Sequence, residues 1–236
     1  MNAGTGILNV WEQGDLVTRG VLLLLLCMSL ASWIVMLLKS LNLATQTRQS
    51  KQIEAFWHAK DFTQGVALLA AHPDSPYLAL AMEGEKAARH IGAQQDTTQH
   101  ELHEGFDFSD WLTRSLQNGI DDATSDLQSG LGILASAGST APFIGLFGTV
   151  WGIYHALMAI GLAGQASLDK VAGPIGESLI MTALGLAVAI PAVLGYNAIV
   201  RANKRVLSRL NRFAHDLHAY FLTGARVGNV KKSGAH

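Results

Sequence analysis

Glu177 is the residue of this chain whose type and setting point most directly to chemistry. It is the only charged residue in an apolar tract that runs from about residue 174 to residue 200. Ionisable side chains within lipid are costly and tend to face a helix bundle or a water-filled path, where a desolvated carboxyl exchanges protons nearer to neutral pH. One interpretation is therefore a proton relay. The other places Glu177 in the first turn of a helix beginning at Pro174, where the helix dipole stabilises a carboxylate near the interface.

Small and polar residues recur on two apolar tracts in steps of four, three, four and three residues. These steps keep residues on one face of a helix. The first tract contributes Gly138, Pro142, Gly145, Thr149 and Gly152, and the second contributes Ser178, Thr182, Gly185, Ala189 and Ala192. Small residues at such steps also let helices pack closely in lipid, and a hydroxyl can bond to a carbonyl of its own preceding turn.

Two sets of site residues follow from these faces. The predicted proton pathway consists of Glu177, Thr149, Thr182 and Ser178. The predicted helix-packing or pore-lining stripe consists of Gly138, Pro142, Gly145, Gly152 and Gly185. The two threonines favour a relay over an interfacial anchor, because they would continue a polar route from Glu177 into the bilayer.

No motif of a known enzyme class appears, so no catalytic residue is predicted. The sequence has no phosphate-binding loop of the G-x-x-x-x-G-K-[ST] type, no G-x-S-x-G and no paired CxxC. Ser139 lacks an activating base, since His155 lies about four turns away on the same predicted helix. Two histidine pairs with i, i+3 spacing lack a third ligand, so no metal site is expected; they are His100 with His103, and His215 with His218.

The surrounding sequence predicts an all-α integral membrane protein. Only 15% of the 236 residues are charged and the mean hydropathy is +0.24, with the charges gathered into blocks. Three apolar tracts are long enough to cross a bilayer, and we predict spans at residues 20–38, 130–162 and 174–200. The first tract is too long for a signal-peptide core and follows acidic residues, which favours a retained helix.

The distribution of lysine and arginine predicts the topology. Basic residues gather after the first and third spans, whereas the opposite side has only Arg19 and Lys170. Residues 1–19 and 163–173 are therefore predicted outside, and residues 39–129 and 201–236 in the cytoplasm. Residues 39–129 show helical spacing interrupted at 72–76, with a polar loop expected over residues 85–105. The net charge of -1 gives no reason to expect a nucleic-acid partner.

Two strings resemble a known membrane family. STAPFIGLFGTVWGIYHAL at 139–157 and AGPIGESLIMTALGLAVAIPAVLGYN at 172–197 resemble the two signature spans of the ExbB/TolQ family of proton channels, relatives of the flagellar stator protein MotA. The resemblance implies that Glu177 corresponds to the family's glutamate of the third span, and that Thr149 and Thr182 correspond to its pore-lining threonines. Ser178 and Met181 stand where alanine is more usual in the family. The wording of STAPF and AGPIGE favours the ExbB branch over the TolQ branch.

The resemblance implies a motor subunit in the bacterial inner membrane, with the N-terminus in the periplasm. Members form a homo-oligomeric ring, commonly a pentamer, around helices of a single-span partner of the ExbD or TolR type. A TonB-like or TolA-like protein delivers the work to the outer membrane, where siderophore or heme uptake is the usual cargo. Protons are the coupling ion, no other cofactor is expected, and lipids surround the ring. A TolQ-like envelope-integrity role and a non-conducting scaffold are the alternatives.

Overall fold

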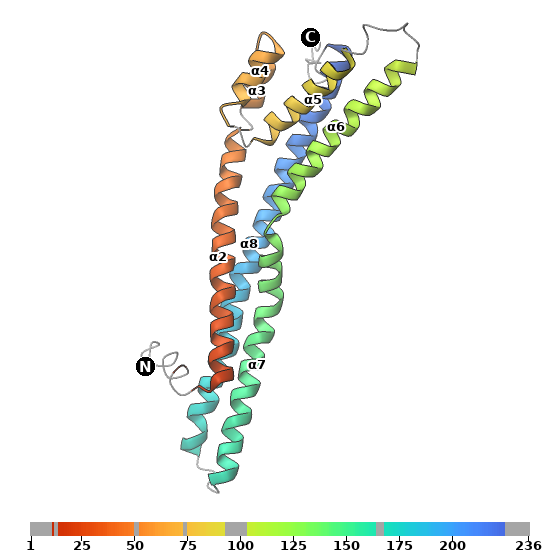
Figure 1. The fold of residues 1–236 in the computed structure, drawn as a ribbon. Coiled ribbons are helices and arrows are strands. Elements are labelled where there is room, and N and C mark those ends of the chain that lie inside the picture. The colour runs from red at the N-terminus through yellow and green to blue at the C-terminus, as the bar shows by residue number, and fades with distance from the viewer. Residues whose placement is uncertain are drawn as a thin grey trace, which may run out of the picture. The chain divides into compact units, whose positions relative to one another are not determined.

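The computed structural model describes Trp11 and residues 14–49, 52–72, 75–92, 103–163 and 168–224. Within these ranges the chain is helical and has no strand, which confirms the all-α prediction. The helices are α2 (Leu16–Gln49), α3 (Gln52–Trp57), α4 (Phe62–Leu69), α5 (Pro76–Gly92), α6 (His103–Gln128), α7 (Leu131–Ala163) and α8 (Leu168–Thr223) (Figure 1). Three stretches of helix are long and apolar enough to cross a membrane, as predicted.

Helix ends in this chain follow local chemistry. Asp15 precedes α2, and its Oδ1 accepts a hydrogen bond of 2.9 Å from the backbone amide of Thr18. Asp61 caps α4 in the same way, with 2.7 Å from its Oδ1 to the amide of Gln64. Both bonds satisfy amides that a helix start leaves without a partner. Between α6 and α7, Gly130 has φ of 75°, a left-handed conformation that suits glycine at a helix end.

The polar loop expected over residues 85–105 is wrong for residues 85–92 and 103–105, and residues 93–102 lie outside the part of the chain that the structure describes. Helix α5 continues to Gly92 and α6 already begins at His103. Lys86 and Arg89 near the end of α5 are exposed, and an ion pair of 2.6 Å joins the half-buried Glu85 to Arg89 one turn later. On the opposite face Ala87 is buried. Polar composition here therefore marks an amphipathic helix rather than an irregular segment.

The chain divides into two compact units, of which unit 1 contains residues 1–40 and 130–200. In unit 1, α2, α7 and the first part of α8 run alongside one another (Figure 1). Its small core joins Val21 and Leu25 of α2, Ala141 of α7, and Met181 and Ala189 of α8. Many large apolar side chains of these helices remain exposed. Such a surface suits contact with lipid or with other membrane helices.

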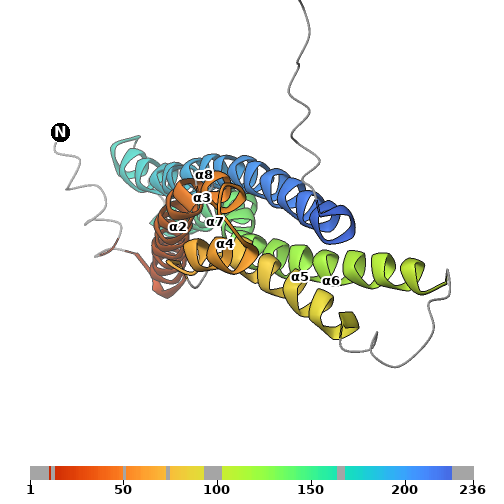
Figure 2. The same ribbon diagram turned by 90° about the horizontal axis from the view of Figure 1, so that it is seen from above.

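Unit 2 contains residues 41–129 and 201–236. Here α5 and α6 lie side by side (Figure 2), and the end of α8 packs with them in a core rich in aromatic rings. The ring centroid of Phe213 on α8 lies 5.3 Å from that of Phe56 and 5.7 Å from that of Tyr77, and both ring pairs have edge-on geometry. Since α8 is continuous over 56 residues, one helix supplies core residues to both units.

Candidate functional site

The faces of α7 and α8 that carry the predicted stripes lie against each other. A Cβ atom on Gly145 would lie 2.6 Å from the carbonyl oxygen of Met181 and 3.0 Å from the Cα of Gly185. A Cβ atom on Gly185 would lie 2.6 Å from the carbonyl oxygen of Ala141. The two backbones thus approach so closely that only glycine fits at either position.

Other glycines extend this contact, which we call the α7–α8 seam, in both directions. A side chain at Gly138 would meet Val193, and one at Gly152 would meet the Ser178 side chain. Gly148, which was not among the predicted site residues, lies against Met181. Pro142 lies inside α7, where its ring nitrogen cannot donate the usual helical hydrogen bond. The seam therefore runs the length of both predicted faces.

Thr149 is the polar centre of the seam. Its side chain is 6% exposed, and its hydroxyl lies 3.1 Å from the Gly145 carbonyl of its own helix. Two further oxygen atoms lie within reach on α8, the Ser178 carbonyl at 3.0 Å and the Thr182 hydroxyl at 2.5 Å. The hydroxyl therefore bonds both within its helix and across to its neighbour. Hydroxyl groups both donate and accept hydrogen bonds, so this pair of threonines can in principle pass a proton.

The structure brings Thr149, Thr182 and Ser178 together at one level of the seam. Ser178 is 6% exposed and supplies the carbonyl that accepts from Thr149. Thr182 lies one turn further along α8, partly buried. The buried placement of all these hydroxyls in an apolar region requires that each find a hydrogen-bond partner.

Glu177 lies within α8, directly before Ser178, and its side chain falls outside the residues that the structure describes. The helix begins at Leu168, so Glu177 comes nine residues, more than two turns, after the start. The interpretation that places Glu177 in a first helical turn begun by Pro174 is therefore wrong. The favourable dipole of a helix start fades beyond its first turn, and it does not account for a carboxyl at this position.

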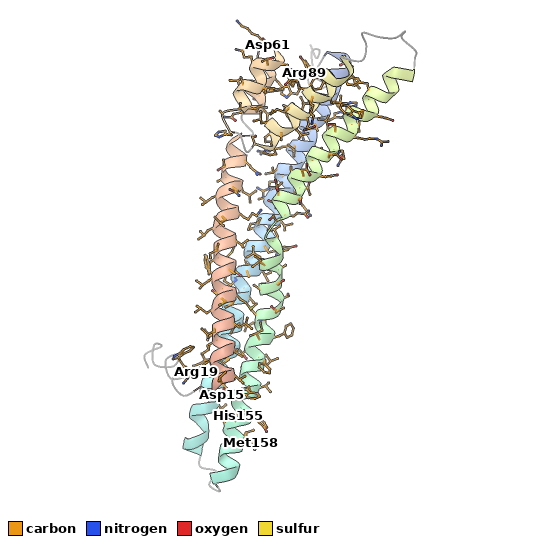
Figure 3. All side chains as sticks on the ribbon, in the orientation of Figure 1. Asp15, Arg19, Asp61, Arg89, His155 and Met158 are labelled. Atoms are coloured by element: carbon orange, nitrogen blue, oxygen red, sulfur yellow. The ribbon has the colours of Figure 1, made fainter. Side chains whose placement is uncertain are left out.

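A second polar cluster, which the sequence analysis missed, joins the start of α2 to α7. The indole Nε1 of Trp151 donates a hydrogen bond of 2.7 Å to Oδ2 of Asp15. The ring of His155 packs on the indole with 4.6 Å between centroids, and Asp15 and His155 lie close together in Figure 3. The hydrogen bond from the Thr18 amide, with smaller effects of Trp151 and His155, holds the pKa of Asp15 below its ordinary value of 3.8, although partial burial opposes this.

An aspartate three residues before Thr18 at the start of an apolar helix is a capping pattern that sequence alone contains. Its partner on α7 lies 136 residues away in the chain. No local pattern links the two, so only the folded arrangement identifies the cluster.

The remaining candidates for chemistry have ordinary surroundings. No group of three metal-ligating side chains occurs among the described residues. Nε2 of His218 lies 3.1 Å from the Thr113 hydroxyl and 3.3 Å from that of Ser109, while the side chains of His100 and His103 fall outside the described part. The hydroxyl of Ser139 donates to the carbonyl of Ser136 at 3.2 Å. His218 thus has two hydroxyl groups as neighbours, whereas the partner of Ser139 is a backbone carbonyl.

Comparison with known proteins identifies the family. Residues 86–212, more than half of the chain, match the MotA/TolQ/ExbB proton channel family. The chain belongs to this family. The match includes α7, the transmembrane part of α8 and the whole seam between them. With its three long apolar helices, this member of the MotA/TolQ/ExbB family is a multi-pass membrane protein.

Relatives from both branches named in the family align with nearly the whole chain. The biopolymer transport protein ExbB of Xanthomonas campestris pv. campestris is 41% identical over 92% of this chain and 86% of its own. The protein of the same name from Neisseria meningitidis serogroup B is 40% identical over 90% of this chain and 96% of its own. The Tol-Pal system protein TolQ of Pseudomonas aeruginosa is 29% identical over 91% of this chain and 92% of its own.

Proposed function

We propose that this chain is an ExbB-like proton-channel subunit of the bacterial inner membrane, which couples the proton-motive force to TonB-dependent transport across the outer membrane. The observation that carries the proposal is the pair of threonine hydroxyls, Thr149 and Thr182, that bond to each other in the seam of a proton-channel family member. Identity of about 40% to proteins named ExbB, against 29% to a TolQ, supports the ExbB-like assignment.

In the proposed path, the Glu177 carboxyl takes up and releases the proton, and the hydroxyls of Thr149 and Thr182 relay it along the seam. Glu177 is the only charged residue in its tract, and Thr182 follows it by five residues on α8. Thr149 both accepts and donates, so it needs no net change of charge to relay a proton. Ser178 contributes its backbone carbonyl, which lies 3.0 Å from the Thr149 hydroxyl and can accept its hydrogen.

The path proposed here requires more than one chain. Thr149 is 6% exposed within a single copy, because the glycines bring α7 and α8 into direct contact. Water and the partner's helices must then reach Glu177 and the threonines from another side. We propose a ring of five copies, the number common in the family, around an ExbD-like single-span protein, with a TonB-like transducer and surrounding lipid. Protons are the coupling ion, and no other cofactor takes part.

The proposed topology places the N-terminus in the periplasm and unit 2 in the cytoplasm. The basic residues that follow Val200 on α8 support it, since lysine and arginine are retained on the cytoplasmic side of membrane helices. The exposed members of this group are Arg201, Lys204, Arg205, Arg209 and Arg212.

A non-conducting scaffold is the second candidate, and the close glycine contacts favour it. Within one chain, Thr149 already has an acceptor on its own helix at 3.1 Å, as a packing hydroxyl would. A TolQ-like role in envelope integrity shares the proton path and differs in the partners.

Proton flux in reconstituted vesicles separates channel from scaffold. The chain and its ExbD-like partner would be placed in liposomes, and a potassium diffusion potential would drive protons past an enclosed pH-sensitive dye. We expect Glu177→Gln, which keeps the side-chain shape, to abolish flux, and Glu177→Asp to retain part of it. Asp110→Asn, on an exposed residue of unit 2, serves as the control. Unchanged flux in Glu177→Gln at equal protein amount would rule out the relay.

Growth assays then separate the branches. The assays use cells that lack the chromosomal copy of the gene for this chain. An ExbB-like subunit would restore growth when a siderophore is the only source of iron, whereas a TolQ-like subunit would restore resistance to detergent. Rescue of detergent resistance alone would overturn the ExbB-like assignment and leave the channel proposal standing.

A further inference from the structure

Unit 2 exposes two groups of opposite charge on two different helices. Asp121 and Asp122 are exposed on α6, and Lys204 and Arg205 are exposed on α8. Each group lies on the side of its helix away from the core, because α6 buries Leu116 and Ile120 and α8 buries Val206 and Leu210. No ion pair joins these four residues to one another or to any other residue that the structure describes.

One hydrogen bond fixes the register of the two groups. The side-chain amide of Asn203, which is 5% exposed, donates to the carbonyl oxygen of Leu127 at 2.8 Å. Lys204 and Arg205 follow Asn203 by one and two residues, and Asp122 and Asp121 precede Leu127 by five and six. At about 1.5 Å per residue, the acids and bases lie within roughly 8 Å of one another along the helix axes. Lysine and arginine side chains are long and flexible enough to bridge that offset.

Membrane insertion makes this shared level significant. Copies of one membrane protein in a ring have the same direction and the same depth, so a residue can meet only those at its own level on the neighbour. A closed ring also uses heterologous contacts, in which one face of each copy meets a different face of the next. Opposite charges at one level on two faces satisfy both conditions, and like charges at that level would oppose them.

We propose that Asp121 and Asp122 of one copy pair with Lys204 and Arg205 of the next copy in the ring. This inference rests on the proposed function, since it names the contact between the subunits of the proposed channel. The pairs lie just beyond the proposed membrane spans, where water screens them. Their main effect is to fix the order and level of neighbouring copies rather than to supply most of the binding energy.

Cysteine cross-linking in membranes tests the contact directly. The chain has one cysteine, Cys27, which is replaced by serine beforehand. Two chains with different tags are produced together, one with Asp121→Cys and the other with Arg205→Cys, so that any product carrying both tags joins separate copies. We expect a short bismaleimide to give this product in severalfold greater yield than either control combination.

The controls keep the helix face and change the level. Asp110→Cys replaces Asp121→Cys on the same face of α6, eleven residues earlier, and Arg212→Cys replaces Arg205→Cys on α8, seven residues later. At about 1.5 Å per residue these shifts are roughly 16 Å and 10 Å. Equal yields from the test and control combinations would overturn the proposed pairing.

Charge reversal gives a second test. In chains without introduced cysteines, Asp122→Lys and Arg205→Glu should each reduce assembly of the ring at low salt, by roughly 1.5- to 5-fold for each exposed pair lost, and the two together should restore it. Arg205→Glu leaves the other basic residues after Val200 in place, so the proposed topology is kept.

Three results are distinguishable. Single copies of the unaltered chain in mild detergent and in membranes would overturn the proposed ring, and this inference with it. A stable ring without the cross-link would overturn this inference alone. A ring indifferent to both reversals, combined with loss of binding to phosphatidylglycerol vesicles in Arg205→Glu, would assign the basic group to lipid headgroups and would also overturn the pairing.

Discussion

The indole of Trp151 on α7 and the carboxylate of Asp15 before α2 are joined by a hydrogen bond of 2.7 Å. The other oxygen of this carboxylate accepts a hydrogen bond from the Thr18 backbone amide, so one side chain both caps α2 and holds it to α7. The ring of His155 packs on the indole, and its charge favours the ionised form of Asp15. A single anionic group thus positions two helices of unit 1 at one end.

Acid should loosen this end of unit 1. The pKa of Asp15 lies below its ordinary value of 3.8, so its stabilising contribution is present above that value and is lost as the pH falls through the lower, folded pKa. We expect the melting temperature in detergent to fall below about pH 4, and Asp15→Asn to weaken that dependence because asparagine caps the helix without charge. Asp15→Ala, which removes the cap, should cost about 1 kcal/mol at neutral pH. An identical pH dependence in Asp15→Asn would contradict this account.

Substitution by alanine should lower the stability at glycines of the seam, but not at glycines where a Cβ atom would contact nothing. In Gly185→Ala the new methyl would lie 2.6 Å from the Ala141 carbonyl, forcing the helices apart at a cost of about 1 to 3 kcal/mol. In Gly176→Ala, on the same helix, it meets no atom within 4 Å, so stability should hold or rise slightly. Thermal unfolding followed by tryptophan fluorescence measures both. Equal losses in the two variants would argue against a seam of close backbone contact.

The hydroxyl of Thr149 should matter more for conduction than for folding. Thr149→Val keeps the shape and removes the hydrogen bonds to Gly145, Ser178 and Thr182, at a cost of about 1 kcal/mol in a membrane. If the proposed path is correct, proton flux in the vesicle assay falls severalfold in Thr149→Val and is retained in Thr149→Ser. Loss of flux in both variants would instead assign Thr149 a packing role through its methyl group.

Removing the hydroxyl group of Tyr77 should stabilise unit 2. This side chain is fully buried, and its hydroxyl has no hydrogen-bond partner among the described residues. Burial raises the pKa of the phenol above 10.0, so the stability associated with its neutral form is lost as the pH rises through the folded pKa. Tyr77→Phe should raise the free energy of unfolding by about 1 kcal/mol and remove part of the alkaline loss. A drop in stability at neutral pH would show that the hydroxyl is satisfied in solution.

Sequence predicted the membrane-crossing helices because the cost of placing charges in lipid leaves long uncharged tracts. It placed the seam residues on shared faces because a helix repeats every 3.6 residues. It erred about where α8 begins, for hydropathy marks where a helix meets lipid and not where hydrogen bonding starts. Leu168 and the two charged residues that follow it are already helical.

Contacts between distant segments lay beyond prediction from one sequence. Asp15 and Trp151 carry no shared pattern, and neither do Asn203 and Leu127. Each pair depends on how helices are rotated and shifted against one another, and packing of the whole core decides that. The direct contact of Gly148 with Met181 has the same origin, although glycine at that position was visible in the sequence.

The Thr149 hydroxyl has one hydrogen atom and three oxygen atoms within reach, so at any moment two of those oxygens lack it. Turning about a single C–O bond transfers the hydrogen from an acceptor on α7 to one on α8, and no carbon atom moves. The direction of the Thr149 O–H dipole can therefore change while Gly145 and Gly185 hold the backbones at their closest approach. In this protein a switch of dipole direction is separable from any sliding of helices, and the O–H stretching band of Thr149 would report it.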